Sequence, residues 1–218
     1  MNAHGSGTEP ADREAVLARV RGALGPDQAK AKDLPRRYRS RSDRDKSGVR
    51  LRFVERCRGY GARCTFAAAD AVSEAIAASL RARGAGRVVI PADLPFAWRP
   101  PGVTCLEDSA ELAADLEAID AAVSGCAVAI AETGTVVLDG GAGQGRRALT
   151  LVPDFHLCVV RADQLVDLVP EAIERLAPAA RAGQPLTLVS GCSATSDIEL
   201  ERVSGVHGPR TLEVLLLD

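Results

Sequence analysis

Aromatic residues are scarce in this chain of 218 residues, in which four Phe, two Tyr and one Trp make up 3% of the sequence. Proteins that bind single-stranded nucleic acid stack bases on aromatic rings, so the scarcity argues against that class. Long apolar runs are also lacking. The longest covers residues 126–131, whereas a transmembrane helix needs roughly 18 residues, and residues 1–10 lack the apolar core of a signal peptide. We therefore expect a cytoplasmic protein without a membrane span.

Closely spaced cysteines are lacking as well. No two of the six cysteines are nearer than seven positions, so there is no C-x-x-C motif for zinc, an iron–sulfur cluster or thiol exchange. Most lie in apolar runs, as Cys105 and Cys158 do, which is typical of buried, reduced thiols. The separated histidines His156 and His207 show no metal-ligand spacing. We expect no metal or cofactor in this chain.

A strong overall charge is absent too, because the formal net charge is −2, but the charge is unevenly distributed. Between Arg36 and Arg58, ten basic residues outnumber three acidic ones, which leaves a local charge of +7. The segment is either a solvated arm that leads into a helix or a docking surface for an acidic partner or anionic ligand. Nucleic acid is a disfavoured partner, because the sequence has no helix-turn-helix or zinc-finger pattern.

Short apolar segments alternate with helical patterns after residue 61, which indicates a three-layer α/β domain over residues 61–218. Residues 1–60 form an Arg-rich helical extension in this interpretation. Segments 121–160 lie too close together for βαβ units, so we expect an antiparallel insertion or edge there. The expected strands are 64–67, 87–91, 103–106, 121–124, 127–131, 135–138, 149–152, 156–160, 186–190 and 212–217, and the expected helices are 11–24, 49–58, 71–83, 110–119, 164–176 and 196–203.

A polar interruption between two apolar segments is the first candidate for chemistry. Glu132, Thr133 and Gly134 separate two expected strands, and glycine in such a place often marks a bulge or a close backbone approach. One interpretation is a tight crossover whose polar groups bond the local backbone. The other places Glu132 at the end of a strand, facing a ligand crevice.

A glycine-rich loop, Asp139–Arg147, is the second candidate. Its backbone N–H groups, together with Arg146 and Arg147, suit an anion. The loop matches neither the dinucleotide-binding nor the P-loop pattern, and strands flank it on both sides. A flexible hairpin loop is therefore the favoured interpretation.

Two segments near the C-terminus complete the candidates. Ser190–Glu199 follows an apolar strand and opens an expected helix, whose N–H groups would attract an anion near Ser193, Thr195 and Asp197. The spacing of Ser196 and Glu199 is equally explained by a capping box. His207 lies in a glycine-flanked loop rather than on an apolar face.

Taken together, these segments resemble the LUD domain and, over nearly the whole chain, the lactate utilisation protein C family. The resemblance rests on Ile130–Thr135, Arg146–Pro153, Ser190–Glu199 and Gly205–Pro209. Cys192 departs from the pattern, since the family usually has proline there. The resemblance implies a NagB/RpiA/CoA-transferase-like fold. It also implies a role in the oxidation of L-lactate to pyruvate alongside two iron–sulfur partner proteins.

Two functions follow as hypotheses. In the first, the chain is an accessory, non-redox subunit of a lactate-oxidising complex, and the iron–sulfur clusters lie on its partners. In the second, it is a stand-alone enzyme or binding protein for a small carboxylate, phosphate or thioester. Glu132 would then be the catalytic base. The ligand-binding residues would be Thr133, Gly134, Arg146, Arg147, Ser190, Ser193, Thr195, Asp197 and His207.

Overall fold

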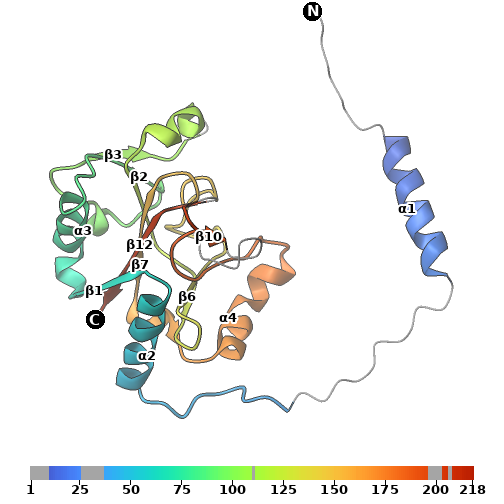
Figure 1. Cartoon of the computed structure of the whole chain (residues 1–218), viewed down its shortest axis with the longest axis horizontal. Helices are drawn as coiled ribbons and strands as arrows, with labels where there is room; N and C mark the ends of the chain where they lie inside the picture. Colours follow the sequence, from blue (N-terminus) through green and yellow to red (C-terminus); the bar gives the residue numbers. More distant parts are fainter. Residues whose placement is uncertain (1–9, 26–36, 110, 196–202, 206–207) are drawn as a thin grey trace, which may run out of the picture. The chain divides into compact units, whose positions relative to one another are not determined.

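The structure is a computed structural model that describes residues 10–25, 37–109, 111–195, 203–205 and 208–218 (Figure 1). The chain forms two compact units, Met1–Tyr38 and Arg39–Asp218. In the first unit, helix α1 (Pro10–Leu24) carries an exposed apolar stripe formed by Val16, Val20 and Leu24. All other elements belong to the second unit. No described helix has the length and apolar content that crossing a bilayer requires.

A six-stranded, all-parallel sheet forms the centre of the second unit, with strand order β1-β12-β7-β4-β2-β3. The interior strands β4 and β7 are buried along their whole length. Such continuous apolar runs are expected where a parallel sheet is covered on both faces. The strands are β1 (Arg63–Ala67), β2 (Arg87–Ile90), β3 (Thr104–Glu107), β4 (Ala121–Ser124), β7 (Phe155–Val160) and β12 (Thr211–Leu217).

Helices cover both faces of this sheet. On one face, α3 (Val72–Arg81) packs Ile76 and Leu80 against a core that includes Leu157 of β7. On the other face, α2 (Lys46–Gly59) buries Phe53 and Cys57 against a core that includes Cys158. Because neighbouring strand residues point to opposite faces, the sheet lies between the two cores. The expected three-layer α/β class is confirmed.

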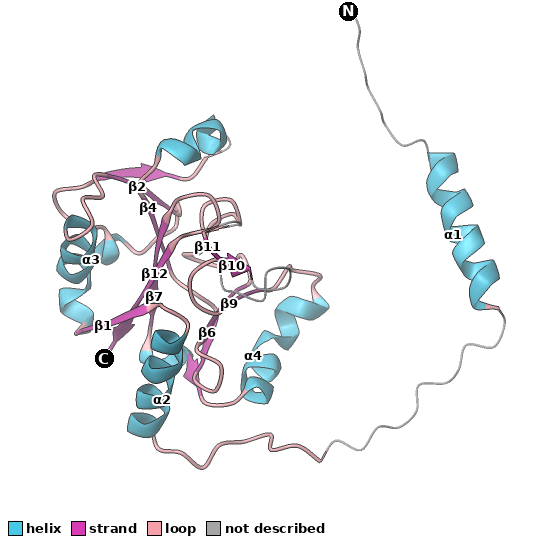
Figure 2. Cartoon of the chain, in the orientation of Figure 1, coloured by secondary structure: helices cyan, strands magenta, loops and turns pink. Residues whose placement is uncertain are grey.

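A smaller, four-stranded sheet covers the α2 side of the central sheet, in the order β8-β5-β6-β9 (Figure 2). Strands β5 (Val128–Ile130) and β6 (Thr135–Leu138) form an antiparallel hairpin, which confirms the expected antiparallel insertion. The other members are β8 (Leu165–Val166) and β9 (Thr187–Val189), and α4 (Val169–Arg181) packs on this sheet. A separate short pair joins β10 (Ala194–Thr195) to β11 (Val203–Ser204).

Three expected elements differ from the structure. Residues 149–152 form a turn rather than a strand. Leu149 is buried in a core cluster, and an apolar pattern alone does not distinguish such a turn from a buried strand. The helix expected over 164–176 begins at Val169, since the Glu171 side chain accepts the backbone N–H groups of Asp167 and Leu168 at the helix start. The third difference is the helix expected over 110–119, where the structure has a 3₁₀ helix, Glu111–Ala118. Further short 3₁₀ helices are Ala69–Ala71, Phe96–Trp98 and Ala162–Gln164.

Part of the expected helix over 196–203 lies outside the described residues, and Val203 belongs to β11. The domain boundary expected after residue 60 stays a prediction. In the structure, α2 precedes that boundary and packs within the unit Arg39–Asp218.

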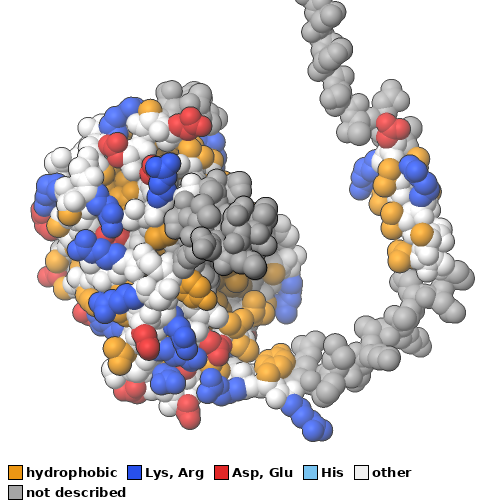
Figure 3. Space-filling view, viewed as in Figure 1, with side chains coloured by type: hydrophobic (Ala, Val, Ile, Leu, Met, Phe, Trp, Pro, Cys, Tyr) orange, Lys and Arg blue, Asp and Glu red, His pale blue; other side chains and the backbone are white. Residues whose placement is uncertain are grey.

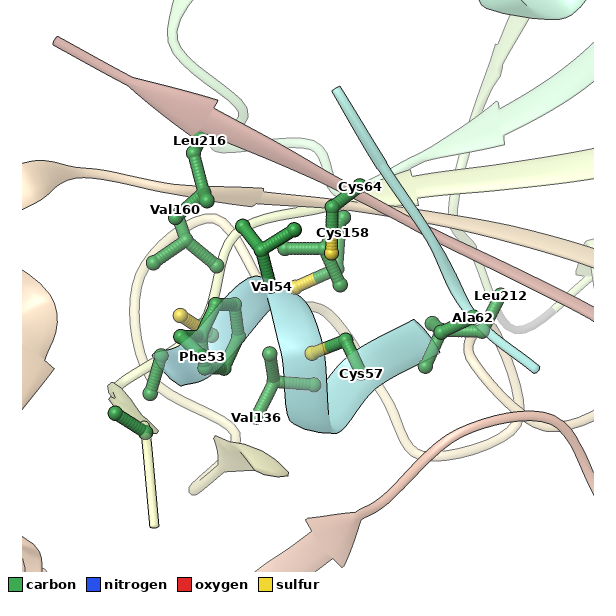
Figure 4. Close-up of a cluster of buried hydrophobic side chains, with 14 of the residues drawn as sticks. Phe53, Val54, Cys57, Ala62, Cys64, Val136, Cys158, Val160, Leu212 and Leu216 are labelled. Carbon is green, nitrogen blue, oxygen red and sulfur yellow. The ribbon is translucent and has the colours of Figure 1, made fainter. Parts of the chain in front are cut away.

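Four cysteines meet in the core beneath α2. Cys57, Cys64, Cys126 and Cys158 are buried free thiols of one hydrophobic cluster, and Figure 4 shows three of them around α2. Hydrogen bonding to Cys126 and burial raise the pKa of the Cys158 thiol well above its usual value. Their burial confirms that they serve as small apolar side chains. Cys105 and Cys192 are half-buried.

Candidate functional site

The glycine-rich loop crosses the carboxyl edge of the central sheet. In the sheet, β2 and β4 are neighbours. The strand that follows β2 in the chain, β3, lies on the outer side of β2, whereas the strand that follows β4, β7, lies on the opposite side of β4. A topological switch point therefore lies between β2 and β4. Gly125, directly after β4, donates its N–H to the carbonyl oxygen of Gly143 at 2.7 Å. Gly143 in turn donates to Oδ2 of Asp93, which follows β2, at 3.0 Å. The loop joins strands of different sheets, so the hairpin interpretation is wrong.

Arg146 is bound to a carboxylate at this edge. Its Nε lies 2.9 Å from Oδ2 of Asp108 and its Nη2 lies 2.5 Å from Oδ1, while Nη2 also donates to the carbonyl oxygen of Ser109. These hydrogen bonds hold the pKa of Asp108 below its usual value. An anion at Arg146 would therefore have to displace or share Asp108.

Arg147 bonds Thr150, and its charge acts on a buried polar pair, His156 and Ser124. Its Nη1 donates to Oγ1 of Thr150 at 2.9 Å. The nearby His156 is 1% exposed, and its Nε2 lies 2.8 Å from Oγ of Ser124. Burial, assisted by the positive charge of Arg147, lowers the pKa of His156 to about 4. The imidazole is therefore neutral at pH 7, and the pair is a satisfied polar contact of the core.

The buried histidine makes stability dependent on pH. An unfolded histidine titrates near pH 6.5 and the folded one near 4, so the unfolded state gains the proton first as the pH falls. The contribution is complete above pH 6.5 and decreases toward pH 4. We expect the free energy of unfolding, from urea titrations, to be about 2 kcal/mol lower at pH 5 than at pH 7.

A variant separates this contribution from that of the carboxylates. His156→Gln should remove most of the change between pH 7 and pH 5, because carboxylates such as Asp108 titrate below that window. Equal stability of the unaltered protein at both pH values would contradict the neutral, buried assignment.

Glu132 lies in an ion-pair cluster between α2 and α4. Nη2 of Arg52 is 3.6 Å from Oε1 of Glu132, and its Nη1 is 2.8 Å from Oδ1 of Asp167. The side chain of Asp167 is 2% exposed, compared with 35% for Glu132. Burial pulls the pKa of Asp167 upward, but hydrogen bonds from Ser42 and Arg52 and the charges of Arg52 and Arg44 outweigh it, so the pKa is lowered.

A row of hydroxyl groups continues from the same turn. Oγ1 of Thr135 lies 2.7 Å from Oγ1 of Thr133 and 2.7 Å from Oγ of Ser190. The flanking glycines touch α2: a Cβ on Gly134 would lie 2.7 Å from the backbone nitrogen of Cys57, and one on Gly191 would lie 2.4 Å from Cβ of Tyr60. Close approach to α2 thus brings Thr133, Gly134 and Ser190 together.

The remaining candidates fall near the β10–β11 pair. Ser193 donates its N–H to the carbonyl oxygen of Pro209 at 3.0 Å and accepts the N–H of Gly205 at 2.8 Å. Thr195 is in β10. Asp197 and His207 lie outside the described residues. The ligand and catalytic roles of all ten candidates stay predictions.

The structure separates the cations of the Arg-rich segment into two groups. Several neutralise carboxylates of the same unit, namely Arg41 with Glu174, Arg44 and Arg52 with Asp167, and Arg50 with Asp218. In the part of the chain that the structure describes, Lys46, Arg56 and Arg58 form no ion pair. Figure 3 shows blue side chains over α2. Sequence reasoning missed Arg52 and Asp167 as a pair, because 115 positions separate them.

Known proteins place the chain in a family. The LUD domain model matches residues 51–217. A protein of Deinococcus radiodurans named "Lactate utilization protein C" is 52% identical over 166 residues, which cover 76% of this chain and 77% of that protein. A protein of the same name from Halalkalibacterium halodurans is 37% identical over 84 residues, covering 37% of this chain and 36% of that protein.

A solved structure agrees with the fold. The crystal structure of a DUF162 family protein from Deinococcus radiodurans superposes with a TM-score of 0.68 and 40% identity, and the match covers 80% of this chain and 99% of that chain. The sequence resemblance and the expected fold are both confirmed. The chain belongs to the LUD domain family.

Proposed function

We propose that this protein serves lactate utilisation as an accessory, non-redox subunit. In this role it works with iron–sulfur partner proteins that oxidise L-lactate to pyruvate. The observation that carries the proposal is its 52% identity to the Deinococcus radiodurans protein named "Lactate utilization protein C", over 77% of that protein's length. The match of the LUD domain model to residues 51–217 supports the same role.

The packing of the cysteines supports placing the clusters on partners. Conversion of L-lactate to pyruvate releases two electrons and two protons, so the complex needs an electron acceptor. An iron–sulfur cluster is held by several thiolates. Here four cysteines are packed as thiols in an apolar core, and the described residues include no group of three or more His, Cys, Asp or Glu arranged for a metal. These cysteines therefore do not fit a cluster.

The switch point at the carboxyl edge of the central sheet supports a role in contact rather than in open-site chemistry. The switch point, where ligands of α/β proteins often bind, is spanned by the chain's own loop through Gly143. Arg146, one of the two arginines on this loop, is already engaged by Asp108. Meanwhile α2 presents Arg56 and Arg58 to solvent, which suits an acidic protein surface.

Affinity capture tests the proposal. The tagged full chain is purified from cells grown on L-lactate and, as a control, from cells grown on glucose. We expect an iron–sulfur protein, identified by iron and acid-labile sulfide assays, to co-purify from the lactate-grown cells. The double variant Arg56→Glu/Arg58→Glu should reduce capture, whereas Arg181→Glu, a single charge reversal on α4, should not. The single variants Arg56→Glu and Arg58→Glu give the comparison at equal charge. Absence of iron and sulfide from the lactate-grown sample would overturn the proposal.

A further inference from the structure

A cavity of about 840 Å³ opens at the carboxyl edge of the central sheet, away from the switch point. It is lined by the end of β12 (Leu216 and Leu217) with the following Asp218, by residues just after β7 (Ala162 and Asp163), by the chain that enters α2 and by the start of α4. Its size is within the range of small-molecule sites. The carboxyl edge is also where ligands of parallel α/β sheets bind.

The chain that enters α2 forms one wall of the cavity, and part-buried hydrogen bonds hold it in place. Ser42 donates its hydroxyl to Oδ2 of Asp167 at 2.5 Å and its backbone N–H to Oε1 of Glu171 at 3.1 Å. Arg52 holds the other oxygen of Asp167 at 2.8 Å. Because the Asp167 side chain is almost fully buried, this anchorage gives the cavity a defined shape.

The inner surface of the cavity is largely apolar. Five aliphatic side chains contribute to it, from α2, β8 and β12: Val49, Leu165, Val166, Leu216 and Leu217. Leu216 belongs to the core cluster beneath α2, and Val49 and Leu165 pack against that cluster, so the cavity extends this apolar core toward solvent. Apolar area of this kind favours a ligand with a hydrocarbon portion.

The lining carries five basic and five acidic side chains, so what distinguishes the two signs is which groups already have a partner. Arg41, Arg44 and Arg50 each form an ion pair with a carboxylate of the rim. Lys46 and Arg175 also line the cavity, and among the described residues neither forms an ion pair with a carboxylate. Arg175 donates to the carbonyl oxygen of Asp163, a neutral partner, at 2.6 Å.

The carboxylates of Glu171 and Asp163, which also line the cavity, already have hydrogen-bond or ion-pair partners. Glu171 accepts three backbone N–H groups, from Ser42, Asp167 and Leu168. Asp163 pairs with Arg161 at 3.1 Å. A bound cation would thus compete with existing partners, whereas an anion would meet two available positive groups.

We propose that this cavity binds an organic anion with an aliphatic chain, a carboxylate whose head group lies at Lys46 and Arg175 and whose chain covers the apolar wall. The second cavity, of about 720 Å³ at the amino edge of the sheet, has no such wall. Its lining includes Glu117, Asp120 and Asp154 next to Arg83 and Arg210. The site is separate from the switch point and goes beyond the proposed role in lactate oxidation.

Calorimetric titration of the purified full chain with decanoate tests the proposal. We expect saturable binding at one site per chain, weakened about tenfold by Lys46→Glu and by Arg175→Glu, since each change replaces an attraction with a repulsion. Arg181→Glu is the matched control, because it makes the same charge change on α4 outside the cavity. All three positions are exposed, so circular dichroism should show the fold unchanged.

Decylammonium, with the same chain length and the opposite charge, distinguishes the head-group requirement from general apolar binding. We expect it to bind at least tenfold more weakly than decanoate. Equal binding of the two compounds would overturn the anion assignment. Loss of affinity in Arg181→Glu as large as in Arg175→Glu, or no saturable decanoate binding, would overturn the site. The titration uses the isolated chain, so its failure leaves the proposed function untouched.

Discussion

Replacing Gly134 with alanine is expected to lower the free energy of unfolding by about 3 kcal/mol. Gly134 has φ of +61°, a conformation that costs alanine about 1 kcal/mol. The added Cβ would also lie 2.7 Å from the backbone of both Arg56 and Cys57. Backbone atoms of a packed helix cannot rotate away, so α2 itself would have to move. Urea unfolding followed by fluorescence of the buried Trp98 measures the loss.

Gly140→Ala is the control for this prediction. Gly140 has a similar φ of +71°, but its added Cβ would meet no atom within 4 Å. We expect a loss of only about 1 kcal/mol, from backbone strain alone. If both variants lose the same stability, α2 does not lie against the β5–β6 turn as described, and the close grouping of Thr133 and Ser190 near α2 would also be in doubt.

Replacing Asp167 with alanine is expected to lower the free energy of unfolding by about 3 to 4 kcal/mol. The change leaves Arg52, which is 17% exposed, without its main carboxylate partner and removes the acceptor of the Ser42 hydroxyl. The chain before α2 should then detach from the domain. Limited trypsin digestion should accordingly cleave faster after Arg41 and Arg44 than in the unaltered protein.

Asp163→Ala provides the matched comparison. Asp163 lines the same cavity, but its side chain is 73% exposed and its ion pair with Arg161 lies in solvent. Pairs of this kind contribute about 0 to 1 kcal/mol. A similar small effect for both aspartates would show that Asp167 does not hold the entering chain, and the defined wall of the cavity would lose its support.

The parts of the fold that depend on local pattern were predictable. Continuous apolar runs identified β4, β7 and β12, and the crowding of strands in 121–160 indicated the antiparallel hairpin of β5 and β6. The start of α4 was not predictable from apolar spacing. It depends on how the side chain of Glu171 folds back on the backbone, and the pattern of Gln164–Leu168 reads equally well as helix.

Which site residues lie close together was predictable only for residues that are neighbours in the sequence. Glu132, Thr133 and Gly134 share one turn, but the hydrogen bond between the hydroxyls of Thr135 and Ser190 joins residues 55 positions apart. Arg146 and its partner Asp108 are 38 positions apart, and Arg52 and its partner Asp167 are 115 positions apart. Contacts of this kind depend on how sheets and helices pack, and the pattern of a single sequence does not reveal them.

Growth on L-lactate tests the central claim, that this protein serves lactate utilisation, most directly. The gene is deleted, and growth rates on L-lactate, pyruvate and glucose are compared with those of a strain complemented by the full chain. We predict loss of growth on L-lactate alone, normal growth on pyruvate, and recovery on complementation. Undiminished growth of the deletion strain on L-lactate, in the absence of another lactate-oxidising system, would contradict the claim.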